Sequence, residues 1–200
     1  MKRSHFAAIL ISAVVAVTGL AAFQFMRTEP ATVRSTGTAL VGGPFVLTGH
    51  DGKKVADEQF RGKYMLVFFG YTYCPDVCPA GLQVMTGALE KLGSDAKDIQ
   101  PLFITVDPER DTVPVLADYM GHFHPRLIGL TGTTGQIADV AKAYRVYYKK
   151  AGDESGNDYL MDHSSILYLM GPQGQFVKHF AYGTDIDALA GEIRAAVAQN

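Results

Sequence analysis

Two cysteines, Cys74 and Cys78, stand in the segment Gly70-Tyr-Thr-Tyr-Cys-Pro-Asp-Val-Cys-Pro79. An apolar run precedes this segment and helical periodicity follows it, so the pair is expected between a buried strand and the first turn of a helix. Unpaired N–H groups and the helix dipole stabilise thiolates there, which predicts lowered pKa values at both sulfurs. Two thiolates that share one ion form a soft site for Cu(I) or Zn(II). The pair can also cycle between dithiol and disulfide, so the motif alone leaves metal and redox chemistry open.

The two cysteines are weak candidates for a structural disulfide. Such a bridge is the simplest role for a cysteine pair in a small exported domain. The loop between Cys74 and Cys78 is so short, however, that closing it restricts the unfolded chain very little and adds little stability. The pair is therefore better explained by chemistry than by cross-linking.

One histidine is expected to reach the cysteine pair. His163 lies in Tyr159-Leu-Met-Asp-His-Ser-Ser165, in a predicted loop that enters a strand beside the first buried strand. Two thiolates and one imidazole make a three-coordinate set that suits Cu(I), whereas zinc needs a fourth ligand. The alternative is a loop histidine hydrogen-bonded to Asp162 or Ser164. The other histidines have no expected role at this site. His5 lies next to the apolar N-terminal run, His50 in a predicted hairpin turn, His122 and His124 at a predicted helix end, and His179 in a predicted strand.

The elements that must position these residues alternate between strand and helix. Short apolar runs predict buried strands at residues 64–69, 101–106 and 127–130, and helical spacing predicts helices after Pro79 and at 112–123, 134–144 and 185–197. Hairpins are expected at 45–56 and 166–182, and an exposed loop at 149–158. This order predicts a mostly parallel sheet with helices on both faces and an antiparallel edge. Cys74 then lies at the carboxyl end of a strand, where ligands bind in such sheets.

The N-terminus has the pattern of a membrane anchor. Lys2 and Arg3 precede an uncharged, mainly apolar run over residues 6–26, long enough to span a bilayer as a helix. Positive residues stay in the cytoplasm, so the rest of the chain should be exported. A cleaved signal peptide is the alternative, with Gly19-Leu-Ala21 as a weak cleavage site. Because the run continues past that site, we expect an uncleaved anchor over residues 1–27.

Composition and charge indicate one globular domain on a tether. Residues 28–43 are rich in Thr, Ser, Gly and Pro, which predicts a linker to a domain over residues 44–200. Hydrophobic residues make up 48% of the chain, and its formal net charge is −2. A charge this close to neutral argues against nucleic acid as a partner.

Four motifs together resemble the Sco/SenC family. They are Cys74-Pro-Asp-Val-Cys78-Pro79 after Phe-Phe-Gly-Tyr-Thr-Tyr, Val106-Asp-Pro-Glu-Arg-Asp111-Thr, Leu130-Thr-Gly-Thr and Asp162-His163-Ser-Ser. The resemblance extends from about Gly43 to the last helix. It implies a thioredoxin-like α/β fold in three layers, with a central mixed sheet, an N-terminal β-hairpin extension and a single N-terminal transmembrane helix.

The resemblance also implies which residues hold a metal. The family's copper ligands fall on Cys74, Cys78 and His163, and none is missing. Asp76 and Asp162 match the family pattern as neighbours of ligands, and Asp162 would orient His163 or contact a partner. Read from the residues alone, the charges of the segment 107–111 pair with one another.

The function implied is that of a copper metallochaperone. Such a protein would take Cu(I) from a donor protein and deliver it to the CuA centre in the copper-bearing subunit of cytochrome c oxidase; whether Cu(II) also binds stays open. The membrane would be contacted through the N-terminal helix. Since no long Arg-rich presequence precedes that helix, the expected location is a bacterial inner membrane with the domain in the periplasm.

Two other functions remain open on sequence. A thiol–disulfide oxidoreductase could reduce the client's copper-site cysteines, although thioredoxin-like sites usually have two residues between their cysteines and a preceding Trp, and His163 has no obvious task in thiol exchange. A thiol peroxidase is weaker, since Tyr71 stands where such sites have Thr. A copper or redox sensor is the other alternative, so enzymatic activity is left undecided.

Overall fold

A computed structural model describes residues 40–152 and 159–198. The strands are β1 (Val46–Gly49), β2 (Lys54–Ala56), β3 (Tyr64–Gly70), β4 (Ile99–Thr105), β5 (Ile128–Thr131), β6 (Tyr148–Ala151), β7 (Leu160–His163), β8 (Leu167–Met170) and β9 (Phe176–Phe180). The helices are α2 (Val77–Leu92), α3 (Val113–Met120), α4 (Thr134–Ala143) and α5 (Ile186–Ala198), with 3-10 turns η1 (Asp57–Phe60) and η2 (Gly93–Asp98). The strands and helices expected after residue 44 are present, with boundaries shifted by a few residues.

The main sheet has seven strands in the order β2-β1-β5-β4-β3-β8-β9. β3, β4 and β5 pair in parallel, whereas β8, β9 and the β1–β2 hairpin are antiparallel to their neighbours. Every residue of β3 and β4 is buried, as expected for central strands covered on both faces. The expected mixed sheet is therefore confirmed, but the prediction that it is mostly parallel is wrong: only two of its six strand pairings, β3–β4 and β4–β5, are parallel. The other four are antiparallel, because hairpins extend the sheet on both sides of the parallel strands.

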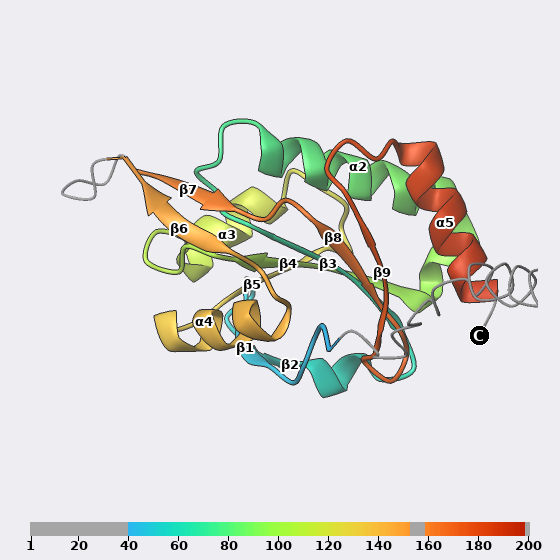
Figure 1. Ribbon diagram of the computed structural model, residues 1–200, viewed down its shortest axis with the longest axis horizontal. Coiled ribbons are helices and arrows are strands. Elements are labelled where there is room, and N and C mark those ends of the chain that lie inside the picture. Colours follow the sequence, from blue (N-terminus) through green and yellow to red (C-terminus); the bar gives the residue numbers. More distant parts are fainter. Residues whose placement is uncertain (1–39, 153–158, 199–200) are drawn as a thin grey trace, which may run out of the picture. The chain divides into compact units, whose positions relative to one another are not determined.

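Helices cover both faces of this sheet. α2 and α5 pack together on one side, and α4 lies on the other (Figure 1). Phe68 of β3 faces α2 at Gly81, whereas its neighbour Phe69 packs against Tyr144 at the end of α4, since successive strand residues point to opposite faces. This is the thioredoxin-like three-layer fold.

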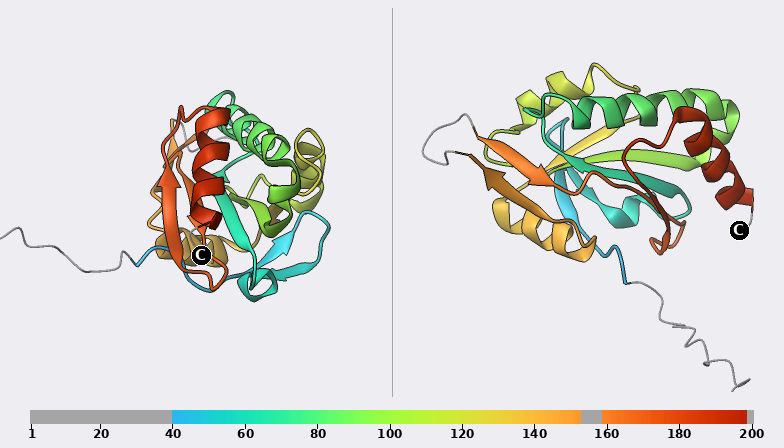
Figure 2. Two further views of the ribbon diagram at one scale, coloured as in Figure 1. Left: turned by 90° about the vertical axis from the view of Figure 1, so that its right-hand side faces the viewer. Right: turned by 45° about the horizontal axis from the view of Figure 1, so that its top comes forward.

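The segment predicted as an exposed loop at 149–158 is partly a strand. Tyr148–Ala151 forms β6, which pairs antiparallel with β7 in a separate two-stranded sheet (Figure 2). The loop was predicted from the polar residues of this segment. A two-stranded ribbon can be polar on one face, however, because only the other face packs against the protein: Met161 of β7 is buried, whereas Lys149 of β6 is exposed. His163 is accordingly the last residue of a strand and not a loop residue. Residues 153–158 lie outside the described residues.

The predicted anchor at 1–27 and most of the predicted linker also lie outside the described residues. Within 40–152 and 159–198, no helix combines the length and hydropathy needed to cross a bilayer.

Candidate metal centre

The cysteine pair lies where β3 passes into α2. β3 ends at Gly70, and a short loop carries Cys74 before Cys78 enters the first turn of the helix. Cys78 is completely buried, whereas Cys74 is partly exposed. A Cβ atom at Gly70 would lie 2.8 Å from Cys78 Sγ, so only glycine lets the strand end approach this sulfur so closely.

His163 comes to the same place from β7. Its Nε2 lies 3.3 Å from Cys78 Sγ, and the three candidate ligand atoms of Cys74, Cys78 and His163 all lie within 4.8 Å of one another. Among the described residues, this is the one group of three or more Cys, His, Asp or Glu side chains with the spacing of a metal site.

Contacts around the imidazole fix its orientation. The rings of Tyr71 and Phe68 lie edge-on to it, at centroid distances of 5.8 and 6.5 Å. Nδ1 lies 3.3 Å from the carbonyl oxygen of Ser164, which can only accept a hydrogen bond. Nδ1 therefore carries a proton, and Nε2 is the nitrogen that faces the sulfurs and is placed to bind a metal.

The two thiols differ in acidity. The pKa of Cys74 is lowered to about 5, mainly by the hydrogen bond that it shares with the Cys78 side chain. Hydrogen bonds from the backbone N–H groups of Asp76 and Cys78 and from His163 lower it further. The same shared hydrogen bond, together with burial, raises the pKa of Cys78. The expectation that both sulfurs would be acidic is wrong for Cys78, because the charge on Cys74 and the loss of water both oppose a second thiolate.

This asymmetry predicts the pH dependence of alkylation in the reduced, copper-free protein. The thiolate is the nucleophile, so modification of Cys74 by iodoacetamide should slow as the pH falls through about 5 and level off above it. Cys78 should stay unmodified over this range because it is buried and its pKa is raised. Peptide mass spectrometry after timed quenching measures both sites, with urea-unfolded protein as the control. Faster modification of Cys78 than of Cys74 would contradict this assignment.

The acidic neighbours of the ligands behave differently from the expectation. Asp162 is exposed, and the contact on Nδ1 of His163 comes from the Ser164 carbonyl, so Asp162 does not orient the imidazole. Asp76 is also exposed, next to the start of α2. Both carboxylates therefore face solvent near the site, where a partner can reach them.

The predicted pairing within residues 107–111 is correct only in part. Arg110 does pair with Asp107, with Nε and Oδ2 2.5 Å apart. Asp111 instead accepts hydrogen bonds from Thr72 and Thr105 and is completely buried. This contact with the cysteine loop was not predictable from the sequence, because residues 72 and 111 are far apart along the chain.

The described histidines outside the site have local roles or lie in solvent. Nδ1 of His50 accepts a hydrogen bond from the Gly129 N–H, and Nδ1 of His124 accepts one from the Arg126 N–H. His122 and His179 are exposed, and His179 stacks on Phe176. None of these four belongs to a metal-binding group of described side chains.

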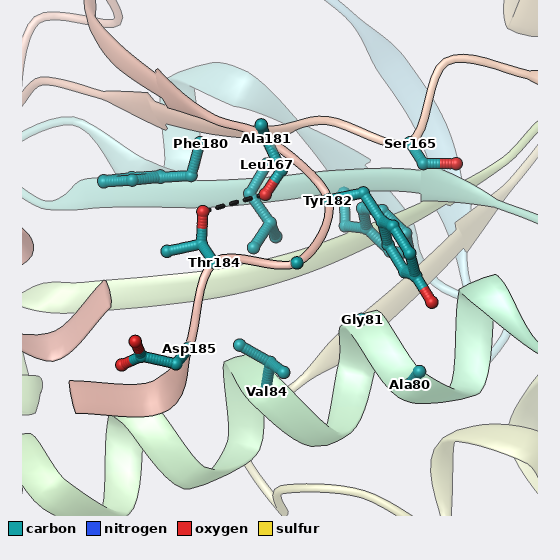
Figure 3. Close-up of a pocket in the computed structure, with 12 residues that line it drawn as sticks. Ala80, Gly81, Val84, Ser165, Leu167, Phe180, Ala181, Tyr182, Thr184 and Asp185 are labelled. Carbon is teal, nitrogen blue, oxygen red and sulfur yellow. Dashed lines mark hydrogen bonds between the residues drawn. The ribbon is translucent and has the colours of Figure 1, made fainter. Parts of the chain in front are cut away.

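A small apolar cavity adjoins the site. Its volume is about 220 Å³, and it lies between α2 and the segment that follows β9 (Figure 3). Phe68, Gly81 and Ser165 connect it to the cysteine and histidine segments, and Tyr182 forms part of its opposite wall. The Thr184 hydroxyl in this wall already donates to the Ala181 carbonyl oxygen, so it is not directed at a ligand.

The sequence matches the SCO1/SenC family model over residues 33–198. The mitochondrial SCO1 homolog 1 of Arabidopsis thaliana is 47% identical over 78% of this chain and 46% of that protein. The human mitochondrial SCO1 homolog is 42% identical over 86% of this chain and 56% of that protein. This chain thus spans about half the length of these curated relatives.

Solved structures show the same fold. Copper-bound ScoI of A. thaliana superposes with a TM-score of 0.75 at 44% identity, over 80% of this chain and 99% of that one. Copper-bound ScoI of Bradyrhizobium japonicum gives a TM-score of 0.72 at 43% identity, over 78% of this chain and 99% of that one. Yeast Sco1 with copper bound gives 0.75 at 38% identity, over 80% of this chain and 90% of that one.

Proposed function

We propose, since this chain belongs to the SCO1/SenC family, that it carries Cu(I) on Cys74, Cys78 and His163 and delivers it to the copper-bearing subunit of cytochrome c oxidase. The observation that carries the proposal is the approach of two sulfurs and one imidazole nitrogen to within 4.8 Å of one another. The copper bound in the related plant, bacterial and yeast structures supports the choice of metal.

The donor set suits Cu(I) better than zinc. Two soft sulfurs and one nitrogen satisfy Cu(I), which accepts three ligands, whereas a structural zinc site needs four. No fourth Cys, His, Asp or Glu joins the group among the described residues. The rings of Phe68 and Tyr71 lie edge-on to His163 and hold its imidazole beside the two sulfurs.

Delivery follows from the different exposure of the ligands. Cys74 is partly exposed and acidic, so an incoming client thiolate can reach the ion on its side. Cys78 is buried and is released last. Each exchange replaces one metal–sulfur or metal–nitrogen bond by a bond to the client, and the oxidation state of copper is unchanged. Oxidation of the pair to a disulfide removes two of three ligands and prevents loading.

The thiol chemistry supports a second candidate function. A thiolate at Cys74 with a protonated, buried Cys78 beside it is the arrangement of an attacking and a resolving cysteine. Cys74 would attack a client disulfide, and Cys78 would then displace the client from the mixed disulfide. The client gains two electrons and two protons, while Cys74 and Cys78 become a disulfide. This activity needs no imidazole ligand, so His163 distinguishes the two functions.

The proposed site of action is the outer face of a bacterial inner membrane. The apolar run at 6–26 supports an uncleaved anchor over residues 1–27, joined by residues 28–43 to the copper-binding domain at 44–200. Full-length protein should stay with membranes through alkaline extraction, and protease added to spheroplasts should digest the domain. A mature chain beginning near Ala22 in the soluble envelope fraction would contradict the anchor.

The function is tested in a strain that lacks the gene and grows at limiting copper. Oxidase activity and copper per oxidase should fall in this strain and recover with the wild-type gene. Added copper should also restore them, because the client then loads without the chaperone. Unchanged copper content of the oxidase in the deletion strain would contradict delivery.

A further inference from the structure

The loop between β4 and α3 contacts the segment that carries the cysteines. Asp111, at the end of this loop, is completely buried and accepts hydrogen bonds from the Thr72 backbone N–H at 3.0 Å and from the Thr72 hydroxyl at 2.6 Å. Thr72 stands two residues before Cys74. The loop therefore fixes the chain where it leaves β3 for the cysteine motif.

Arg110, in the same loop, extends this contact to the strand that carries His163. Its Nη1 donates to the Tyr159 carbonyl oxygen at 2.8 Å, and its Cζ lies 3.7 Å from the centre of the Tyr159 ring. Cζ also lies 4.7 Å from the ring of Tyr73, the residue before Cys74. The Arg110 guanidinium thus contacts Tyr73, which is next to Cys74, and Tyr159, which is four residues before His163.

Tyr71 makes a third connection. Its ring lies 5.9 Å from Arg110 Cζ and edge-on to the imidazole of His163. The cysteine segment and the histidine strand are therefore held together by side chains that meet at Arg110.

Asp107 fixes the position of Arg110 itself. One carboxylate oxygen pairs with Arg110 Nε, and the other accepts a hydrogen bond from the Tyr159 hydroxyl at 2.9 Å. The exposed fractions of the Arg110 and Asp107 side chains are 14% and 1%, so water screens this pair little. A planar guanidinium with donors in fixed directions can satisfy Asp107 and the Tyr159 carbonyl at once, and a lysine ammonium lacks that geometry.

We propose that Arg110 is a positioning residue for the copper site, which holds the cysteine loop and the His163 strand at the separation that three-coordinate binding requires. The inference rests on the proposed function. Arg110 acts through Tyr73 and Tyr159 and is no ligand itself. Because the protein arranges its donors before the ion arrives, binding does not have to include the cost of ordering them.

Arg110→Lys tests this positioning role. The variant keeps a positive charge beside Asp107 but loses the planar fork that reaches Tyr159. We expect Cu(I) affinity to fall about 10–100-fold, as for the loss of other groups that orient metal ligands. X-ray absorption of the copper-loaded variant should show the nitrogen neighbour weakened or lost beside two retained sulfurs. A role confined to stability would lower the melting temperature without changing the coordination of the folded protein.

Lys150→Met is the matched control. Lys150 is the other cation over the Tyr159 ring, with Nζ 4.4 Å from its centre, and it pairs with Glu109 of the same loop. The side chains of Lys150 and Glu109 are 31% and 56% exposed, so water screens this pair more than the Arg110–Asp107 pair and it contributes less. We expect wild-type affinity and coordination from this variant.

Wild-type copper affinity and a retained nitrogen neighbour in folded Arg110→Lys would overturn the proposal. If this variant does not fold, Tyr73→Leu replaces it, since Tyr73 is exposed and its loss removes the contact of Arg110 with the cysteine loop. Weaker copper binding by Tyr73→Leu supports the positioning role, and unchanged binding overturns it. If wild-type protein itself binds no Cu(I), or binds it without nitrogen, the proposed function fails, and that result is independent of the variants.

Discussion

Replacement of Cys78 by Ser is expected to abolish tight Cu(I) binding. Loss of a residue that only orients a metal ligand lowers affinity 10–100-fold, so loss of a ligand should lower it more than about 100-fold. The remaining thiolate and imidazole are too few soft donors to retain the ion against a chelator. Anaerobic competition with a chromophoric Cu(I) chelator measures the change, on protein that begins at residue 28.

Cys74→Ser should lose copper binding to a similar extent, because the structure places both sulfurs beside His163. The disulfide form of the wild-type protein should bind no better than either variant, since oxidation removes the same ligands. Tight one-to-one Cu(I) binding by the disulfide form would contradict the assigned site.

His163→Ala is expected to separate copper binding from thiol chemistry. It leaves two sulfurs and removes the imidazole nitrogen, so Cu(I) affinity should fall by at least about 10–100-fold. Disulfide exchange with a small thiol should continue, because Cys74 and Cys78 remain. His163 is among the groups that lower the pKa of Cys74, so the pH midpoint of Cys74 alkylation should rise in the variant.

His179→Ala is the matched control for this variant, since His179 is exposed in β9 and stacks on Phe176, away from the ligand group. It should behave like wild type in both assays. Equal copper retention by His163→Ala and His179→Ala would show that His163 is not a copper ligand. Normal oxidase assembly at limiting copper in a His163→Ala strain would favour the reductase function.

The central elements of the fold were predictable because their sequence signals are local. β3 and β4 are continuous apolar runs, which buried parallel strands require. α4 begins at Thr134 with a capping box between Thr133 and Gln136. A threonine followed three residues later by a glutamine is a known sequence pattern for the start of a helix. The β6–β7 ribbon was less predictable, because its polar residues resemble those of a loop. The ribbon forms because β6 pairs with β7, a strand that lies further along the chain.

The site was predictable to the extent that it depends on spacing and strand order. Cys74 and Cys78 are recognisable as a pair, and the order of strands brings His163 to them. The raised pKa of Cys78 was missed, because it depends on complete burial and on a hydrogen bond shared with Cys74. The contacts of Arg110 with Tyr73 and Tyr159 were also missed, since they join residues distant in sequence.

Copper transfer between purified proteins is the decisive measurement for the proposed delivery. Protein from residue 28, loaded anaerobically with one Cu(I), is mixed with the copper-free, reduced CuA-site domain of the oxidase subunit, and the two are separated and assayed for copper. We expect copper to move to the client, and we expect Cys78→Ser and His163→Ala to deliver little because they retain little. Copper that stays on the loaded protein, while an oxidised client is still reduced by the copper-free protein, would contradict delivery.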